Sequence, residues 1–150
     1  EGFQEVGNET LVAVMAPSHP VLQAAGRDGL LREVHLIDTR QIVVASRDRA
    51  ITDPRLVFAR HVWRTDTPVA ALGLIEAGLG WGWLPRSFVR APLAAGTVRA
   101  LPFENLTNAM ALWVDVVWSK ERPLGLGAQR FIRMMQAARG AASADQAASL

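Results

Sequence analysis

The chain contains no cysteine and lacks any long uninterrupted apolar run. Without cysteine it has no disulfides, no thiol catalysis and no thiolate metal site, and this composition suits a reducing compartment. No segment approaches the roughly 18 apolar residues that a membrane span needs, so we expect no membrane association. Charge of one sign is also scarce, because the formal net charge is only +2.

The usual catalytic motifs are missing as well. The serine-hydrolase pattern G-x-S-x-G does not occur, and the three histidines have no paired metal-binding spacing (His19, His35 and His61). Three closely spaced glycines are superficially like a dinucleotide loop, but they follow a predicted helix and precede a predicted strand (Gly78, Gly80 and Gly82). We therefore predict a protein that is not an enzyme, with no metal site and no cofactor.

What the chain does have is the composition of a globular domain. Half of its 150 residues are hydrophobic and a fifth are charged, which is enough for one sizeable core. Arginine is concentrated between Arg40 and Arg64. A solvated, salt-bridged surface is one interpretation of this cluster, and a rim that attracts an anionic small molecule is the other. We do not expect this chain itself to bind nucleic acid, since no basic helix accompanies the charge.

The stretch from Trp63 to Pro85 carries the clearest local pattern. Thr67 can cap a helix, and Pro68 fits the first helical position, where a missing N–H costs nothing. The next nine residues are almost wholly apolar, which predicts a mostly buried helix. Gly78 is suited to the left-handed conformation that ends helices. A short buried strand, Trp81 to Leu84, follows.

Strand-like and helical segments alternate through the first hundred residues. The strands are predicted at Thr10 to Ala16, Arg40 to Ser46 and Leu56 to Trp63, and a short helix from Arg86 to Ala91 is predicted to end at Pro92. Such alternation predicts an α/β fold with a mostly parallel sheet and flanking helices. A further strand at Met110 to Trp118 and an amphipathic helix at Ala128 to Ala138 complete the pattern; the residues beyond it are predicted to fray.

Ligands of parallel sheets gather outside the carboxyl ends of the strands. Two predicted strands end at Ser46–Arg47 and at Thr65–Asp66, and Thr67 begins the buried helix beside them. Hydroxyls, one carboxylate, backbone N–H donors and an arginine would suit a carboxylate or another oxygen-rich metabolite. The simpler interpretation, that Thr67 only caps a helix, stays open.

Four segments in the same order resemble one known family. Ala77-Gly-Leu-Gly-Trp-Gly-Trp-Leu-Pro85 resembles a glycine-rich signature in the effector-binding region of LysR-type transcriptional regulators. Leu11-Val-Ala-Val-Met-Ala-Pro-Ser-His-Pro20 resembles the family's strand and following turn, and Ala94-Ala-Gly-Thr-Val-Arg-Ala-Leu101 a later strand. Ala111-Leu-Trp-Val-Asp-Val-Val-Trp118, with the helix after it, resembles the family's end. The pair Trp81 and Trp83 departs from the smaller residues common there and suggests a subgroup.

The resemblance implies a fold similar to type II periplasmic binding proteins, with two α/β lobes and an effector between them. Residues 10–101 would form a near-complete second lobe, after an extension or hinge at 1–9. Residues 102–138 would return to the first lobe, and 139–150 would be a flexible tail. The other parts of the first lobe and a winged helix-turn-helix domain, the only part that contacts DNA, would precede this chain.

It also implies a cytoplasmic regulator that assembles as a dimer or tetramer and senses a small effector, which the arginine cluster suggests is anionic. Ser46 and Arg47 fall where relatives often place effector-contacting residues, and we group them with Thr65, Asp66 and Thr67 as the candidate ligand site. A solute-binding protein of the same fold, associated with transport, is the alternative. An enzyme is the third choice.

Overall fold

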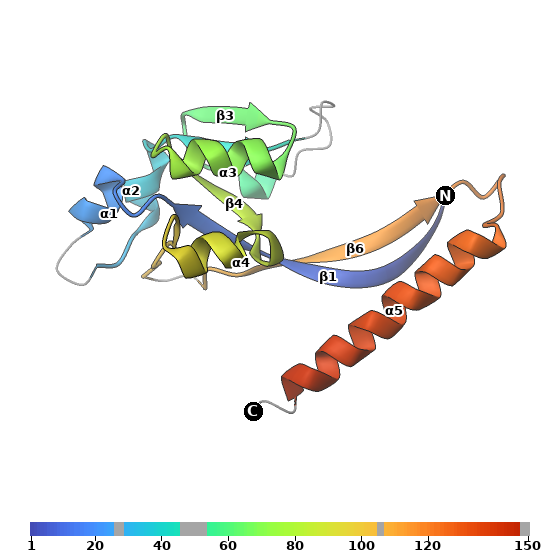
Figure 1. The fold of residues 1–150 in the computed structure, drawn as a ribbon. Coiled ribbons are helices and arrows are strands. Elements are labelled where there is room, and N and C mark those ends of the chain that lie inside the picture. Colours follow the sequence, from blue (N-terminus) through green and yellow to red (C-terminus); the bar gives the residue numbers. More distant parts are fainter. Residues whose placement is uncertain (26–28, 46–53, 105–106, 148–150) are drawn as a thin grey trace. The chain divides into compact units, whose positions relative to one another are not determined.

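The structure, a computed structural model, describes residues 1–25, 29–45, 54–104 and 107–147. The chain divides into two compact units, which are described separately below. Unit 1 contains residues 1–9 and 111–150, and unit 2 contains residues 10–110. The chain passes from one unit to the other within two paired strands, β1 (Gly2–Met15) and β6 (Met110–Trp118) (Figure 1).

Unit 2 is built on an open mixed sheet with the strand order β3-β2-β4-β1-β5. Its other strands are β2 (Gln41–Val44), β3 (Val62–Thr65), β4 (Trp81–Pro85) and β5 (Arg99–Ala100). The expected parallel pairing holds for β2 with β3 and with β4, whereas β1 runs antiparallel to β4 and β5. This is the predicted α/β fold.

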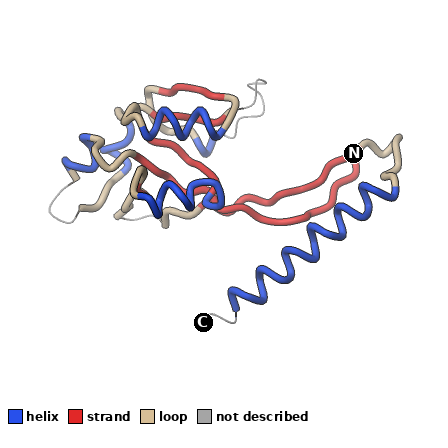
Figure 2. Tube along the Cα trace, in the orientation of Figure 1, coloured by secondary structure: helices blue, strands red, loops and turns tan. Residues whose placement is uncertain are grey.

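Helices cover both faces of the unit 2 sheet, as Figure 2 shows by colour. The helical elements are α1 (Pro20–Ala24), α2 (Glu33–Ile37), the 3-10 turn η2 (Pro54–Leu56), α3 (Pro68–Glu76) and α4 (Arg86–Ala95). Alternate residues of β1 point to opposite faces. Val12 and Val14 pack with α3 and α4, and Ala13 and Met15 pack on the other face with Leu31 and α2. The sheet therefore has a core on each side.

The central stretch folds as its sequence predicts. Thr67 caps α3, Pro68 occupies the first turn, and Gly78 has a φ of 76°, in the left-handed region. Gly82 of β4 passes so close to β2 that an added Cβ would lie 2.4 Å from the carbonyl oxygen of Ile42. Glycine is required at position 82 because the β-carbon of any other residue would overlap the Ile42 carbonyl oxygen.

The predicted bounds of one helix and one strand of unit 2 are wrong. Pro92 does not end the helix after β4, because α4 continues through it to Ala95 and is closed by Gly96 at a φ of 75°. The packing of Val89 and Leu93 on the core supports the helix across the hydrogen bond that proline cannot donate. The third strand is confined to Val62–Thr65 and follows η2 and an irregular segment.

Unit 1 consists of the first part of β1, most of β6 and the long helix α5 (Leu126–Ala147). β1 begins at Gly2, earlier than predicted, and α5 extends beyond its predicted end at Ala138. Val6 and Ile132 are buried, and the Gln136 amide donates to the carbonyl of Glu5. Within the described residues, no helix combines the length and apolar character that crossing a bilayer requires.

Candidate functional site

The carboxyl ends of β2 and β3 meet at one edge of the unit 2 sheet, as we expected from the sequence. Val44 is in register with Thr65, and the amide of Ala45 donates a hydrogen bond of 2.9 Å to the carbonyl of Thr65. Helix α3 begins three residues later, so Thr65, Asp66 and Thr67 lie together on this edge. Ser46 and Arg47, the other two predicted site residues, lie outside the described residues.

Local hydrogen bonds already use part of this polar edge. The Thr67 hydroxyl accepts from the Ala70 amide at 3.2 Å, and the Thr65 hydroxyl donates to the Thr67 carbonyl at 3.2 Å. Asp66 is exposed and takes part in an interaction of its own within the chain. Thr67 thus has a structural role as a helix cap. Its hydroxyl occupies the Ala70 N–H, which is therefore not available to a bound anion.

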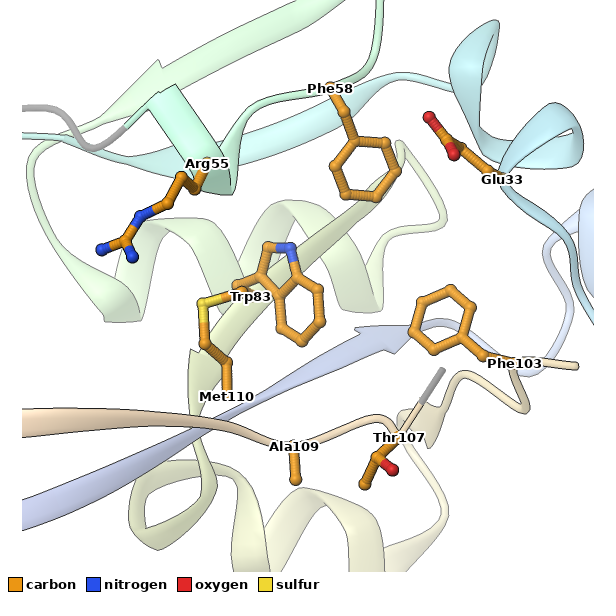
Figure 3. A pocket seen from close by; sticks show the side chains of 8 residues that line it. All are labelled: Glu33, Arg55, Phe58, Trp83, Phe103, Thr107, Ala109 and Met110. Atoms are coloured by element: carbon orange, nitrogen blue, oxygen red, sulfur yellow. The ribbon is translucent and has the colours of Figure 1, made fainter. Parts of the chain in front are cut away.

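A second feature of unit 2 is a pocket of about 330 Å³ on the sheet face opposite α3 and α4 (Figure 3). Its aromatic walls are Phe58, Trp83 and Phe103, and its charged lining residues are Glu33 and Arg55. The rest of its lining comes from the start of β6 and the residues just before it, namely Thr107, Ala109 and Met110. We call this the aromatic pocket.

The three rings that line the aromatic pocket belong to a continuous row of four aromatic side chains, in which Trp81 is the fourth. The ring centroids of Phe58 and Trp81 are 4.9 Å apart, those of Trp81 and Trp83 are 6.4 Å apart, and those of Trp83 and Phe103 are 6.3 Å apart. Two tryptophans meet on one face because they are separated by one residue, Gly82, along a strand. Trp81 is fully buried as core, whereas Trp83 is only partly buried and lines the pocket.

A buried glutamine holds the Phe58 wall in place. Gln41 is 1% exposed and lies at the start of β2. Its side-chain amide donates to the carbonyl of Leu56, and its carbonyl oxygen accepts from the amides of Phe58 and Ala59 at 3.2 and 3.3 Å. The segment before β3 has no strand partner at these groups, so one side chain replaces the missing backbone pairing.

The Phe103 wall is fixed by contacts with the chain before α2. The Leu31 amide donates to the carbonyl of Pro102, and the Glu104 amide donates to the carbonyl of Leu31 at 3.0 Å. The Arg32 guanidinium forms a two-point ion pair with the Glu104 carboxylate. Hydrogen bonding to Arg32, and its charge, hold the pKa of Glu104 below its usual value.

His19 has a structural role in the turn before α1. The His19 ring accepts a hydrogen bond from the Val21 amide at 3.2 Å and caps α1, and burial lowers the pKa of this histidine. Among the described residues, no group of three or more His, Asp or Glu side chains is placed to hold a metal ion.

Sequence reasoning missed the aromatic pocket. Its residues come from four separate segments, and only Trp83 is singled out by its sequence context. Phe58 lies within a segment that we expected to be a regular strand, and Phe103 lies beyond the end of β5 at Ala100. The observation that two tryptophans replace smaller residues in the glycine-rich stretch was the available signal.

The family model described as "LysR substrate binding domain" matches residues 2–140. A curated relative, the HTH-type transcriptional regulator AceR of Acinetobacter baumannii, is 38% identical over 133 residues. That alignment covers 88% of this chain and 43% of AceR, so the chain spans about two fifths of the length of this relative.

Solved structures with the same fold include the regulatory domain of MetR, a LysR family regulator from N. meningitidis. It has a TM-score of 0.66 at 18% identity, covering 94% of this chain and 65% of that one. Full-length LysG from Corynebacterium glutamicum, with its bound effector Arg, has a TM-score of 0.55 at 23% identity and covers 76% of this chain and 38% of LysG.

Proposed function

The chain belongs to the LysR substrate-binding domain family, and we propose that it is the effector-binding region of a longer transcriptional regulator. The helix-turn-helix domain that contacts DNA would lie in another part of that polypeptide. The observation that carries the proposal is the family match across residues 2–140. The relative AceR, named as an HTH-type regulator, is more than twice as long as the matched segment, which supports the further domain.

The burial pattern of unit 1 supports the division into lobes that we propose. Large apolar side chains of β6 and α5 are exposed, among them Trp113 at 70% and Met134 at 63%. Patches of this kind mark surfaces that another part of a protein covers. Unit 2 would be the second effector-binding lobe, and unit 1 would be the part of the first lobe to which the chain returns, completed by the remaining residues of that lobe.

We place the effector site at the strand-end edge of unit 2, on Ser46, Arg47, Thr65, Asp66 and Thr67. Supporting this placement, β2 and β3 end side by side next to the start of α3. An oxygen-rich metabolite, such as a small carboxylate, would meet hydroxyls, backbone donors and the Arg47 guanidinium there. The nearby acid, Asp66, would select against ligands with a second negative charge on that side.

The proposed mechanism is a shift between two lobe arrangements. A ligand that contacts both lobes binds better when they are closed, so it raises the population of the closed arrangement. In a cytoplasmic dimer or tetramer, DNA-bound subunits would sense that shift through their linkers. The chain's own task would be binding without turnover, which is consistent with a family of transcriptional regulators.

Differential scanning fluorimetry tests the site. We expect millimolar acetate or benzoate to raise the melting temperature of the chain, and the double variant Arg47→Ala/Thr67→Ala to lose that response. Thr67→Ala alone also removes a helix cap worth about 1 kcal/mol. Each response is therefore measured against the ligand-free melting temperature of the same variant.

Thr67→Ser, which keeps the capping oxygen, is the matched control and should retain both stability and response. A double variant that responds to the carboxylates as strongly as the wild type would show that the strand-end edge is not the site. The same result would leave the family membership intact, since that rests on the sequence match.

A further inference from the structure

We propose that the aromatic pocket of unit 2 is a binding site for a compact organic cation, with the Glu33 carboxylate as its counter-ion. Three rings and one carboxylate from separate segments surround a single cavity (Figure 3). This site uses different residues from the strand-end edge. It therefore goes beyond the effector site proposed above and is tested independently of it.

The walls favour a cation over an anion. Phe58, Trp83 and Phe103 present aromatic rings to one cavity, and the faces of such rings carry partial negative charge. Substituted ammonium groups bind in aromatic cages of this kind because the ring quadrupoles attract the charge and the methyl groups pack against carbon. An organic anion would meet the same ring faces with repulsion.

The charges around the pocket agree with this choice. Glu33 lines the pocket, and in Figure 3 its carboxylate lies beside the Phe58 ring; no hydrogen bond or ion pair to this carboxylate is found among the described residues. Arg55 also lines the pocket, but its guanidinium points away from the rings and takes part in an interaction of its own. Glu104 is ion-paired with Arg32. Glu33 is therefore the acid that is placed to meet a ligand.

The cavity is also preformed and of suitable size. Its volume of about 330 Å³ lies at the small end of the range typical of ligand pockets, which is roughly 300–1,000 Å³. The Phe58 wall is held by Gln41 and the Phe103 wall by the backbone of Leu31, so the walls need little ordering on binding. A trimethylammonium group with a short tail fits this space.

Three probes of nearly the same shape separate charge from size. Choline carries a trimethylammonium group, 3,3-dimethylbutan-1-ol is its neutral carbon analogue, and 3,3-dimethylbutanoate is an anion of similar bulk. Each is titrated into the ¹⁵N-labelled protein, and the indole N–H resonances of the five tryptophans are followed. The variant Trp83→Phe identifies the resonance of Trp83.

We expect choline to shift the Trp83 resonance and to bind about fivefold more tightly than the neutral alcohol. Glu33→Gln should remove this preference without unfolding the protein, since Glu33 is exposed. Glu121→Gln changes another exposed acid, in unit 1, and should leave the preference unchanged.

Equal binding of choline and the alcohol, tighter binding of the anion, or no shift at Trp83 up to about 50 mM choline would each overturn the proposal. So would a preference for choline that survives Glu33→Gln. None of these results bears on the carboxylate response of the strand-end edge, which is measured with other probes and other variants.

Discussion

Replacing Gln41 with leucine is the sharpest test of how unit 2 is held together. Gln41 is buried, and its side chain satisfies one carbonyl and two amides of the segment 56–59. Leucine has a similar size but can pair with none of them. A buried polar group left unpaired costs about 1–3 kcal/mol. The hydrogen bond from the Ala59 amide is buried and the other two are partly buried, so we expect Gln41→Leu to lower the free energy of unfolding by about 3 kcal/mol in total.

Urea denaturation followed by tryptophan fluorescence measures this loss, because the Trp81 ring contacts Phe58 in the segment that Gln41 holds. Gln129→Leu is the matched control. The Gln129 side chain is exposed and donates one hydrogen bond, to the carbonyl of Leu124, so its loss should cost less than about 1 kcal/mol. If Gln41→Leu proves as mild as this control, the segment 56–59 is held by something other than the glutamine.

Two further substitutions test the packing of each unit. Gly82→Ala should destabilise the protein by about 1–3 kcal/mol, because the new Cβ would overlap the backbone of β2. Gly73→Ala, in an open stretch of α3, should instead stabilise the protein by about 0.5–1 kcal/mol. Thermal unfolding compares the two variants, and equal effects would contradict the close approach of β4 to β2. The exposed apolar face of unit 1 should bind a hydrophobic dye whose fluorescence rises on binding. The double variant Trp113→Ser/Phe131→Ser should reduce the dye fluorescence more than Trp63→Ser in unit 2 does. A monomer that does not bind the dye would contradict an uncovered lobe surface.

Sequence alone predicts the elements whose signals are local. The start of α3 depends on a capping threonine and a proline, and its end on Gly78, all within a dozen residues. The strand after it is a short apolar run bounded by Gly80 and Pro85. Each of these choices follows from the conformational preferences of the residue itself, so neighbouring structure is not needed to make them.

The longer elements depend on partners far away in the chain. Residues 2–9 are polar and glycine-punctuated, yet they continue β1 because β6 pairs with that strand. Pro92 is a helix breaker by its own chemistry, but α4 continues because its apolar side packs on the core of unit 2. In both places, long-range packing and strand pairing override the conformational preference of the local residues, and these interactions cannot be identified from a single sequence.

The two candidate sites differ in the same way. The strand-end edge follows from the rule that parallel strands end together, and Thr65 and Asp66 lie where that rule puts them. The aromatic pocket needs Phe58, Trp83 and Phe103 to converge from segments that no short motif connects. Only the structure brings these rings to one cavity, and only then does the single carboxylate beside them indicate a ligand class.

The most direct test of the central claim is the sequence of the reading frame on the N-terminal side of this chain. Our account predicts the remaining part of the first lobe and, before it, a helix-turn-helix domain with a recognition helix. A secretory signal peptide followed by lobe residues alone would contradict it, and would identify instead a solute-binding protein of the same fold.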